Sequence, residues 1–154
     1  MQRPIRRKDR ALPQEQAREI LTRGEYGVLS TVSSDGQPYG VPVSFCFKDN
    51  TITFHCAVKG QKLENLAAND RVSFCVVGKT ELLPGEFATR YESAIAFGKA
   101  SELTGEEKLN GLREIVRKYS PGFLEKGEKY IVDNIRKARL FKIEIETLSG
   151  KARR

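Results

Sequence analysis

The sequence predicts a mainly β protein: a six-stranded antiparallel barrel, closed or nearly closed, with flanking helices. Apolar and polar residues alternate in six short segments, as they do in strands with one buried face, and few other segments have helical spacing. Turn residues separate several of these segments, which keeps the strands short. Closure leaves no exposed strand edge, so a barrel is favoured over the alternative, a half-open α+β sandwich.

The first half of the chain predicts one helix followed by three strands. The helix is expected over residues 13–23, and the strands over residues 26–33, 38–47 and 51–57. Asp35-Gly36 and Asp49-Asn50 predict turns, because glycine and asparagine accept positive φ readily. Consecutive strands joined by such short turns predict a meander.

The second half predicts three strands and three helices. A short helix carries Leu63, Leu66 and Ala67, and Asn69-Asp70 ends it. Strands are expected over 71–77, 91–103 and 140–147, with a long loop containing Pro84 and Gly85 between the first two. Thr104 and Glu107 fit a capping box at the start of a helix, Ser120-Pro121-Gly122 ends it, and another helix is expected over 125–137.

Length and charge limit the kind of protein. The 154 residues predict a single domain, 1–154, with basic tails at 1–10 and 148–154 and a net charge of +7. Solvated tails explain this charge as readily as nucleic acid, an anionic membrane surface or an anionic cofactor would. No apolar run approaches the roughly 18 residues of a membrane span, and no signal sequence is apparent, so a cytoplasmic protein is expected.

The cysteines and the one histidine argue against a metal site. Cys46, Cys56 and Cys75 all fall within strand-like apolar runs, which predicts buried, reduced thiols rather than a disulfide. His55 has no second histidine and no Cys-x-x-Cys pair to complete a zinc site. We therefore expect no bound metal.

The segment from Thr51 to Lys62 is the most informative one for chemistry. A strand ends, Gly60 allows close backbone approach, and a helix begins with Lys62 in its first turn. Free N–H groups and the partial positive charge at a helix start favour an anion, and Lys59 and Lys62 add full charges. A solvated surface lysine is the alternative reading. The spaced glycines of a nucleoside triphosphate loop are absent.

Three roles are open for His55. It can be a structural histidine bonded to a backbone carbonyl, a proton donor that acts near neutral pH, or an axial haem ligand. Cys56 lies on the opposite face of the predicted strand and is expected in the core rather than as a nucleophile. A nucleic-acid-binding barrel is disfavoured, because the basic residues do not alternate with the strand aromatics.

An ordered set of motifs resembles the flavin-binding split-barrel superfamily, which includes pyridoxamine phosphate oxidase. The motifs are residues 6–10, Asp35 to Ser44, Phe54 to Ala57, Gly60-Gln61-Lys62 and Tyr91 to Ala100. They span nearly the whole chain and are most similar to the nitroimidazole-resistance branch. The C-terminal arginine-rich segment of the oxidase is missing, which argues against pyridoxamine phosphate as substrate.

The resemblance implies a six-stranded split barrel, a homodimer and a site for FMN, with deazaflavin or haem as alternatives. Pro42, Val43 and Ser44 would lie along the isoalloxazine ring, with His55, Cys56 and Ala57 beside it. Gln61 and Lys62 would hold the phosphate, and Tyr91 and Ser93 would border the site, from the second subunit. The implied activity is a flavin-dependent reductase that uses NAD(P)H and a small acceptor such as a nitroimidazole. A flavin- or haem-binding protein without turnover is the alternative.

Overall fold

The computed structural model describes residues 2–154 and contains one antiparallel sheet of eight strands. The strands are β1 (Ala11–Leu12), β2 (Gly27–Val32), β3 (Pro38–Val43), β4 (Cys46–Lys48), β5 (Thr51–Cys56), β6 (Arg71–Leu83), β7 (Ala88–Leu103) and β8 (Arg139–Arg153). The helices are α1 (Gln14–Arg23), α2 (Gln61–Ala68), α3 (Gly105–Tyr119) and α4 (Leu124–Asn134). The mainly β class with flanking helices is confirmed, but the predicted number of six strands was wrong.

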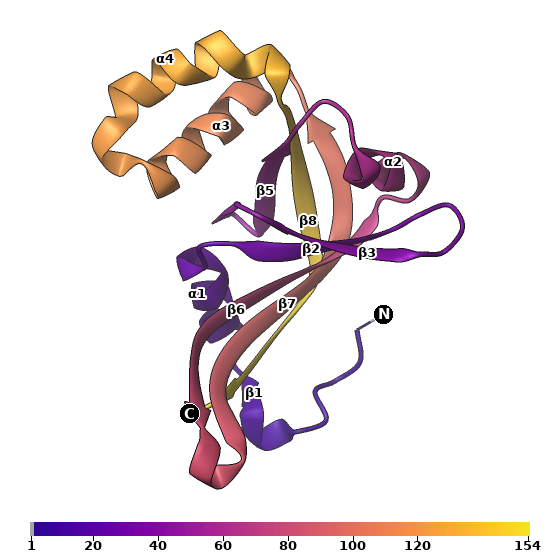
Figure 1. Cartoon of the computed structure of the whole chain (residues 1–154), viewed down its shortest axis with the longest axis vertical. Helices are drawn as coiled ribbons and strands as arrows, with labels where there is room; N and C mark the ends of the chain where they lie inside the picture. The colour runs from indigo at the N-terminus through magenta and orange to yellow at the C-terminus, as the bar shows by residue number, and fades with distance from the viewer. Residues whose placement is uncertain (1) are drawn as a thin grey trace.

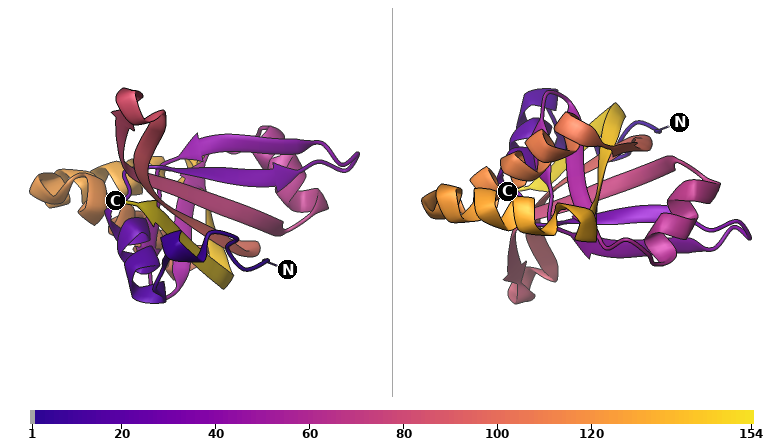
Figure 2. Two further views of the ribbon diagram at one scale, coloured as in Figure 1. Left: turned by 90° about the horizontal axis from the view of Figure 1, so that it is seen from below. Right: turned by 90° about the horizontal axis from the view of Figure 1, so that it is seen from above.

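The strand order makes a sheet that curls on itself. The order is β3-β2-β6-β7-β8-β5-β4, with β1 paired to β8. Because β3 and β4 stand at the two ends of this order yet are joined by only Ser44 and Phe45, the sheet must curl to bring its ends together. Figure 1 shows α3 and α4 at one end of this sheet and α1 along its side, and Figure 2 shows both ends of the molecule.

The strand predicted over 38–47 is broken at Ser44 and Phe45, which interrupts the predicted meander: its first part, β3, pairs with β2, and its second part, β4, pairs with β5. The Phe45 N–H donates to Tyr119 Oη at 2.9 Å, and Lys118 Nζ donates to the Phe45 carbonyl at 2.8 Å. These side chains from α3 occupy the backbone groups that a continuous strand would use for its ladder. As a result β5 pairs with β4 and β8, not with β3.

The long loop expected between residues 77 and 91 is instead a β-hairpin arm. Strand β6 continues to Leu83 and β7 begins at Ala88, with a register shift between Val77 and Thr80. Residues 148–153, expected as a basic tail, complete β8: Leu148 pairs with Ala96 and Arg153 with Tyr91. The missed part of β6 is mostly polar and exposed. Residues 148–153 do alternate between buried and half-buried positions, but two of the three buried ones are Gly150 and Ala152, which give little hydrophobic signal.

The local turn predictions are confirmed, but the capping box is not. Gly36 has φ +89°, and Asp49 and Asn50 have φ +50° and +59°, as their turns require. Thr104 is the N-cap residue of α3, but its hydroxyl makes no capping hydrogen bond. Helix α3 therefore begins after Thr104, as predicted, but the predicted hydrogen bond of the Thr104 hydroxyl is not formed.

The main core fills the curled sheet. Phe45, Phe54 and Phe74 are fully buried there, and α1 adds Ala17, Ile20 and Leu21. A smaller cluster of Leu103, Ile115 and Leu140 lies between α3 and the sheet. No helix within residues 2–154 combines the length and the apolar character needed to span a bilayer.

Candidate functional site

The predicted site residues of β3 and β5 lie on the two sides of a gap in the sheet, where the chain around Ser44 leaves β5. We call this gap between Ser44 and His55 the split. Cys46 faces Thr53 in the β4–β5 pair, so the same register continued by two residues brings Ser44 toward His55. No ladder forms there, because β3 leaves to pair with β2. The chain then runs from His55 directly to α2, which lies beside this split in Figure 1.

Some residues at the split expose their side chains, and others expose only their backbone groups. Pro42, Ser44, His55 and Ala57 are exposed, whereas Val43 and Cys56 turn into the core. The strand alternation thus offers four side chains to a ligand, and Val43 can offer only its backbone groups. Ser44 adds backbone groups that no strand ladder occupies.

The start of α2 has free hydrogen-bond donors. Gly60 is its N-cap residue, with φ +146°, a conformation that L side chains rarely adopt. The Gly60 carbonyl accepts from the N–H groups of both Leu63 and Glu64, at 3.1 and 3.2 Å. The N–H groups of Gln61 and Lys62 precede these and have no intrahelical partner. Two donors therefore remain for a ligand at this end.

Two lysines at the same helix start carry positive charge that no described carboxylate neutralises. Neither Lys59 nor Lys62 forms an ion pair with any carboxylate in residues 2–154. Lys62 is half-buried, which limits its screening by water. Free N–H groups and an unpaired ammonium at a helix start are groups that can hold a phosphate-sized anion.

The positive charge of Lys62 affects the pKa of His55. Although its side chain reaches the surface, partial desolvation of the ring lowers the pKa of His55, and the nearby charge of Lys62 lowers it further. The imidazole is therefore mostly neutral at pH 7 and can donate or accept one hydrogen bond. An anion bound at Lys62 would oppose the second effect and favour the protonated ring.

We expect the His55 titration to report on Lys62 directly. In the unliganded protein the pKa of His55 lies below 6.5, and a Lys62→Ala variant shifts it upward, but only in part because desolvation remains. The folded state binds this proton less readily than the unfolded state, so His55 adds stability above pH 6.5 that declines as the pH falls. NMR titration of the imidazole of the only histidine measures the pKa. An unchanged pKa in Lys62→Ala would show that the two groups are not coupled.

The cysteines offer no nucleophile. Desolvation by burial raises the pKa of Cys46, Cys56 and Cys75, so all three remain thiols at neutral pH. All three are free cysteines. Cys56 therefore contributes to packing rather than to thiolate chemistry.

Tyr91 and Ser93 lie away from the split in the same chain. Tyr91 pairs with Arg153 and Ser93 with Lys151, at the base of the β6–β7 arm. Burial acts to raise the pKa of the Tyr91 phenol, but hydrogen bonds from Arg10 and Lys151 outweigh it and lower the pKa. A single chain thus gathers eight of the ten predicted binding residues and leaves these two apart.

Sequence reasoning missed Lys118 and Tyr119, which hold the strand break next to Ser44. The Tyr119 hydroxyl accepts from the Phe45 N–H and lies 2.6 Å from the Glu25 carbonyl. Lys118 Nζ sits 3.8 Å from the centre of the Phe45 ring, and desolvation lowers the pKa of Lys118. More than 70 residues separate these partners, so no local pattern could reveal them.

Removal of the Tyr119 hydroxyl should loosen this break. A Tyr119→Phe variant leaves the part-buried Phe45 N–H without its acceptor, which we expect to lower the free energy of unfolding by about 1–2 kcal/mol. Urea unfolding measures the change. Tyr130→Phe is the control, because Tyr130 is 68% exposed. Equal stability of the two variants would contradict the role of the hydroxyl.

A hollow is lined by residues of β2, β6, β7 and β8. Its volume is about 530 Å³, within the range of small-molecule sites, and its lining includes Ser30, Ser73 and Phe97. Ser30 pairs with Gly40 on one side and with Ser73 on the other, so this row runs across three strands. The next pair on the same face of β2 and β3 is Val28 and Pro42. The hollow is therefore one residue pair away from Pro42.

Comparison with known proteins identifies relatives along most of the chain. The family described as pyridoxamine 5'-phosphate oxidase matches residues 13–152. A 5a,11a-dehydrotetracycline/5a,11a-dehydrooxytetracycline reductase of Streptomyces rimosus is 42% identical over 55 residues, 33% of this chain. The match covers only 39% of that reductase.

Two solved structures share the fold. A candidate 5-nitroimidazole antibiotic resistance protein of Bacteroides thetaiotaomicron has a TM-score of 0.75 at 22% identity, covering 92% of this chain and 86% of its own. An FAD-binding protein of Mesorhizobium loti has a TM-score of 0.69 at 26% identity, covering 94% of this chain and 98% of its own. The similarity therefore extends over nearly the whole of both chains.

Proposed function

This chain belongs to the pyridoxamine 5'-phosphate oxidase family, and on that premise we propose that it is an FMN-dependent reductase. It would transfer electrons from NADH or NADPH to a small acceptor such as a nitro-aromatic compound. The resemblance to the split-barrel superfamily that the ordered motifs indicated is confirmed by the family match over residues 13–152. The reductase and the FAD-binding protein among the relatives support flavin redox chemistry.

The start of α2 carries the proposal, because it fits a phosphate group. The N–H groups of Gln61 and Lys62 have no helical partner, and the Lys62 ammonium forms no ion pair within residues 2–154. Apart from the residues adjacent to Gly60 in the chain, none of the described atoms lies within 4 Å of where a Gly60 Cβ would be. A phosphate can therefore approach the backbone closely and meet both donors and charge. FMN carries one such phosphate at the end of its ribityl chain.

The split between β3 and β5 would position the flavin ring. Pro42 and Ala57 offer small apolar surfaces, and the backbone groups at Val43 and Ser44 offer hydrogen bonds to a polar ring edge. His55 would donate or accept one hydrogen bond there, and a phosphate at Lys62 would make it easier to protonate. The flavin itself supplies the redox chemistry by accepting and returning a hydride or single electrons.

A homodimer would complete the site. Val77 and Ile95 are 54% and 38% exposed on the sheet face opposite α1, and half-buried Cys75 and Phe97 continue this apolar surface. A second copy on this face would cover it and bring its own Tyr91 and Ser93, which lie on the same face of β7, toward the split. Both flavin sites would then lie at the interface.

A charge in this face should separate the subunits. We expect Ile95→Arg to sediment as a monomer and to bind FMN more weakly, because Ile95 lies at the centre of the apolar surface. Analytical ultracentrifugation measures the mass, with Val132→Arg on α4 as the exposed control. A wild-type protein that sediments as a monomer at micromolar concentration would refute the dimer.

Purification and turnover test the proposed function. The protein should be yellow, release FMN on heating, and oxidise NADH or NADPH faster than free FMN when an acceptor is present. FMN binding without turnover would leave a flavin-binding protein and refute the reductase. A colourless protein that refuses added FMN would refute flavin binding altogether, and a Soret absorption band would identify haem in its place.

A further inference from the structure

The two basic ends of the chain meet in one place. β1 pairs with residues Gly150 and Lys151 of β8, and Arg153 of β8 pairs with Tyr91 at the base of the β6–β7 arm. A hollow of about 700 Å³ lies there, lined by residues from α1, β6, β7 and the end of β8. Its cationic lining residues are Arg23, Lys79, Arg90, Arg153 and Arg154. Charges that appear scattered in the sequence thus surround one groove, which we call the basic groove.

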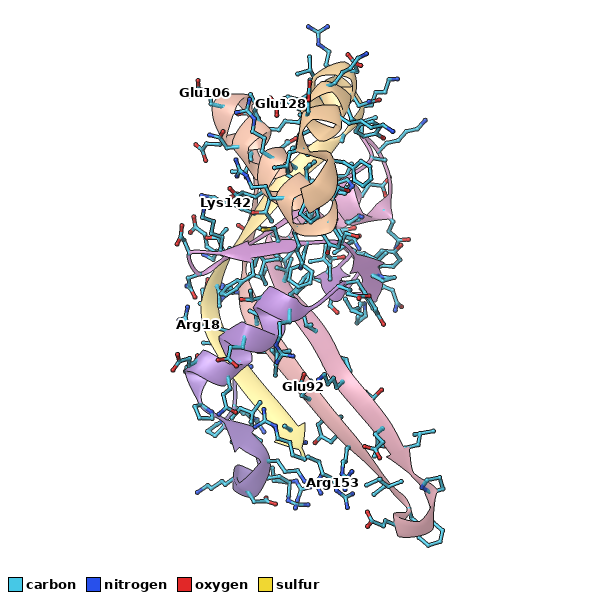
Figure 3. The ribbon with its side chains drawn as sticks, turned by 90° about the vertical axis from the view of Figure 1, so that its left-hand side faces the viewer. Arg18, Glu92, Glu106, Glu128, Lys142 and Arg153 are labelled. Carbon is cyan, nitrogen blue, oxygen red and sulfur yellow. The ribbon has the colours of Figure 1, made fainter. Side chains whose placement is uncertain are left out.

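The buried carboxylate of Glu92 contacts two arginines that line the basic groove. The Glu92 side chain is only 11% exposed, and its Oε1 lies 3.2 Å from Arg23 Nη1 and its Oε2 3.9 Å from Arg154 Nη2. The Lys79 N–H also donates to Glu92 Oε1, at 3.4 Å. Figure 3 shows Glu92 on β7 above the end of β8, where Arg153 lies. Glu92 therefore holds two guanidinium groups from different elements at the groove.

Positive charge remains in excess after these contacts. The lining contains five cationic side chains but only two acidic ones, Glu81 and Glu92. Arg90 pairs with Glu81 at 3.2 Å, whereas Lys79 and Arg153 form no ion pair within residues 2–154. Arg10 and Lys151 add further charge beside Tyr91 at the rim. A concave surface with one sign of charge concentrates the field and attracts anions.

We infer that the basic groove binds a nucleotide that carries two or more phosphate groups. Its volume suits a small molecule, and its cations converge on one hollow from several elements rather than following a strip, as a nucleic-acid strand would require. Guanidinium groups bind phosphates with paired hydrogen bonds, and several of the lining cations are arginines. If the proposed reductase activity is correct, the nucleotide half of the electron donor is the natural occupant.

Binding of nucleotide fragments to the full chain tests this inference. Calorimetric titration at low salt would use adenosine 2',5'-bisphosphate and ADP as probes, because the first mimics the phosphorylated end of NADPH and the second the diphosphate of NADH or FAD. The double variant Lys79→Gln, Arg153→Gln removes two charges that form no ion pair with any described residue. The double variant Lys126→Gln, Lys129→Gln on α4 removes the same charge from another surface.

We expect at least one probe to bind, about tenfold more weakly to the groove variant and equally to the α4 variant. Tighter binding of the bisphosphate identifies a phosphorylated nicotinamide donor, and tighter binding of ADP identifies a diphosphate. Absence of binding, or equal binding to both variants, overturns the inference. So does binding of a single-stranded oligonucleotide that depends on Lys79 and Arg153 when neither probe binds. The same variants are also titrated with FMN. Unchanged FMN affinity in the groove variant shows that a loss of nucleotide binding does not come from damage to the proposed flavin site.

Discussion

Substitution of Lys62 by alanine is expected to weaken FMN binding by roughly 10- to 100-fold. A charge-assisted hydrogen bond to phosphate contributes about 1.5–3 kcal/mol, and each 1.4 kcal/mol is a factor of ten in affinity. No carboxylate in residues 2–154 forms an ion pair with Lys62, so its full charge is available to the phosphate. Quenching of flavin fluorescence on titration of the apoprotein measures the dissociation constant.

Two control variants test whether the loss of FMN affinity in Lys62→Ala comes from the missing charge at this position. Lys129→Ala on α4 removes an exposed lysine from another surface and should bind FMN as the parent does. Lys62→Arg keeps the charge and should recover much of the affinity, especially at low salt, where screening is weakest. If Lys62→Ala bound FMN as tightly as the parent, the phosphate would be held elsewhere and the proposed orientation of the flavin would be wrong.

The sequence predicted the parts of the site that depend on neighbouring residues. The sequence predicted a turn at Gly36, a strand over 51–57 and a short helix with Lys62 in its first turn. The structure has all three, with the strand ending at Cys56 and the helix starting at Gln61. Lys62 was therefore placed correctly at a helix start. The turn and the helix start depend on hydrogen bonds that span only a few residues. The strand was found from the alternation of neighbouring residues, although its ladder partner β8 is distant in the sequence.

Features set by distant partners could not be predicted in the same way. The break at Phe45 depends on Lys118 and Tyr119, and the basic groove depends on Glu92 drawing together Arg23 and Arg154. Neither set has a periodic signature. The β6–β7 arm was missed because Pro84 and Gly85 predict a loop, while its polar strands are defined by pairing with each other rather than by burial. Topology, rather than propensity, determines these parts.

A second large effect is expected from Gly98→Ala in the middle of the sheet. A Cβ at Gly98 would lie 2.1 Å from the Glu144 carbonyl oxygen and 2.9 Å from the Glu144 carbonyl carbon. The position coincides with the register shift between Phe97 and Gly98, where β8 comes unusually close to β7. Backbone atoms cannot avoid the methyl group by changing a rotamer, so the two strands must separate. We expect the free energy of unfolding to fall by about 3 kcal/mol or more.

Gly122→Ala is the matched control, because apart from its neighbours in the chain no atom of the described residues lies within 4 Å of where its Cβ would be. The same single methyl group should change the stability there by less than about 0.5 kcal/mol. Urea unfolding of both variants measures the difference, and equal stability would show that β7 and β8 tolerate a wider spacing. Because β8 beyond the shift carries Lys151 and Arg153, a folded Gly98→Ala protein should also lose nucleotide binding in the basic groove. The close contact of β7 and β8 would then set both the stability of the sheet and the position of the charges at its end.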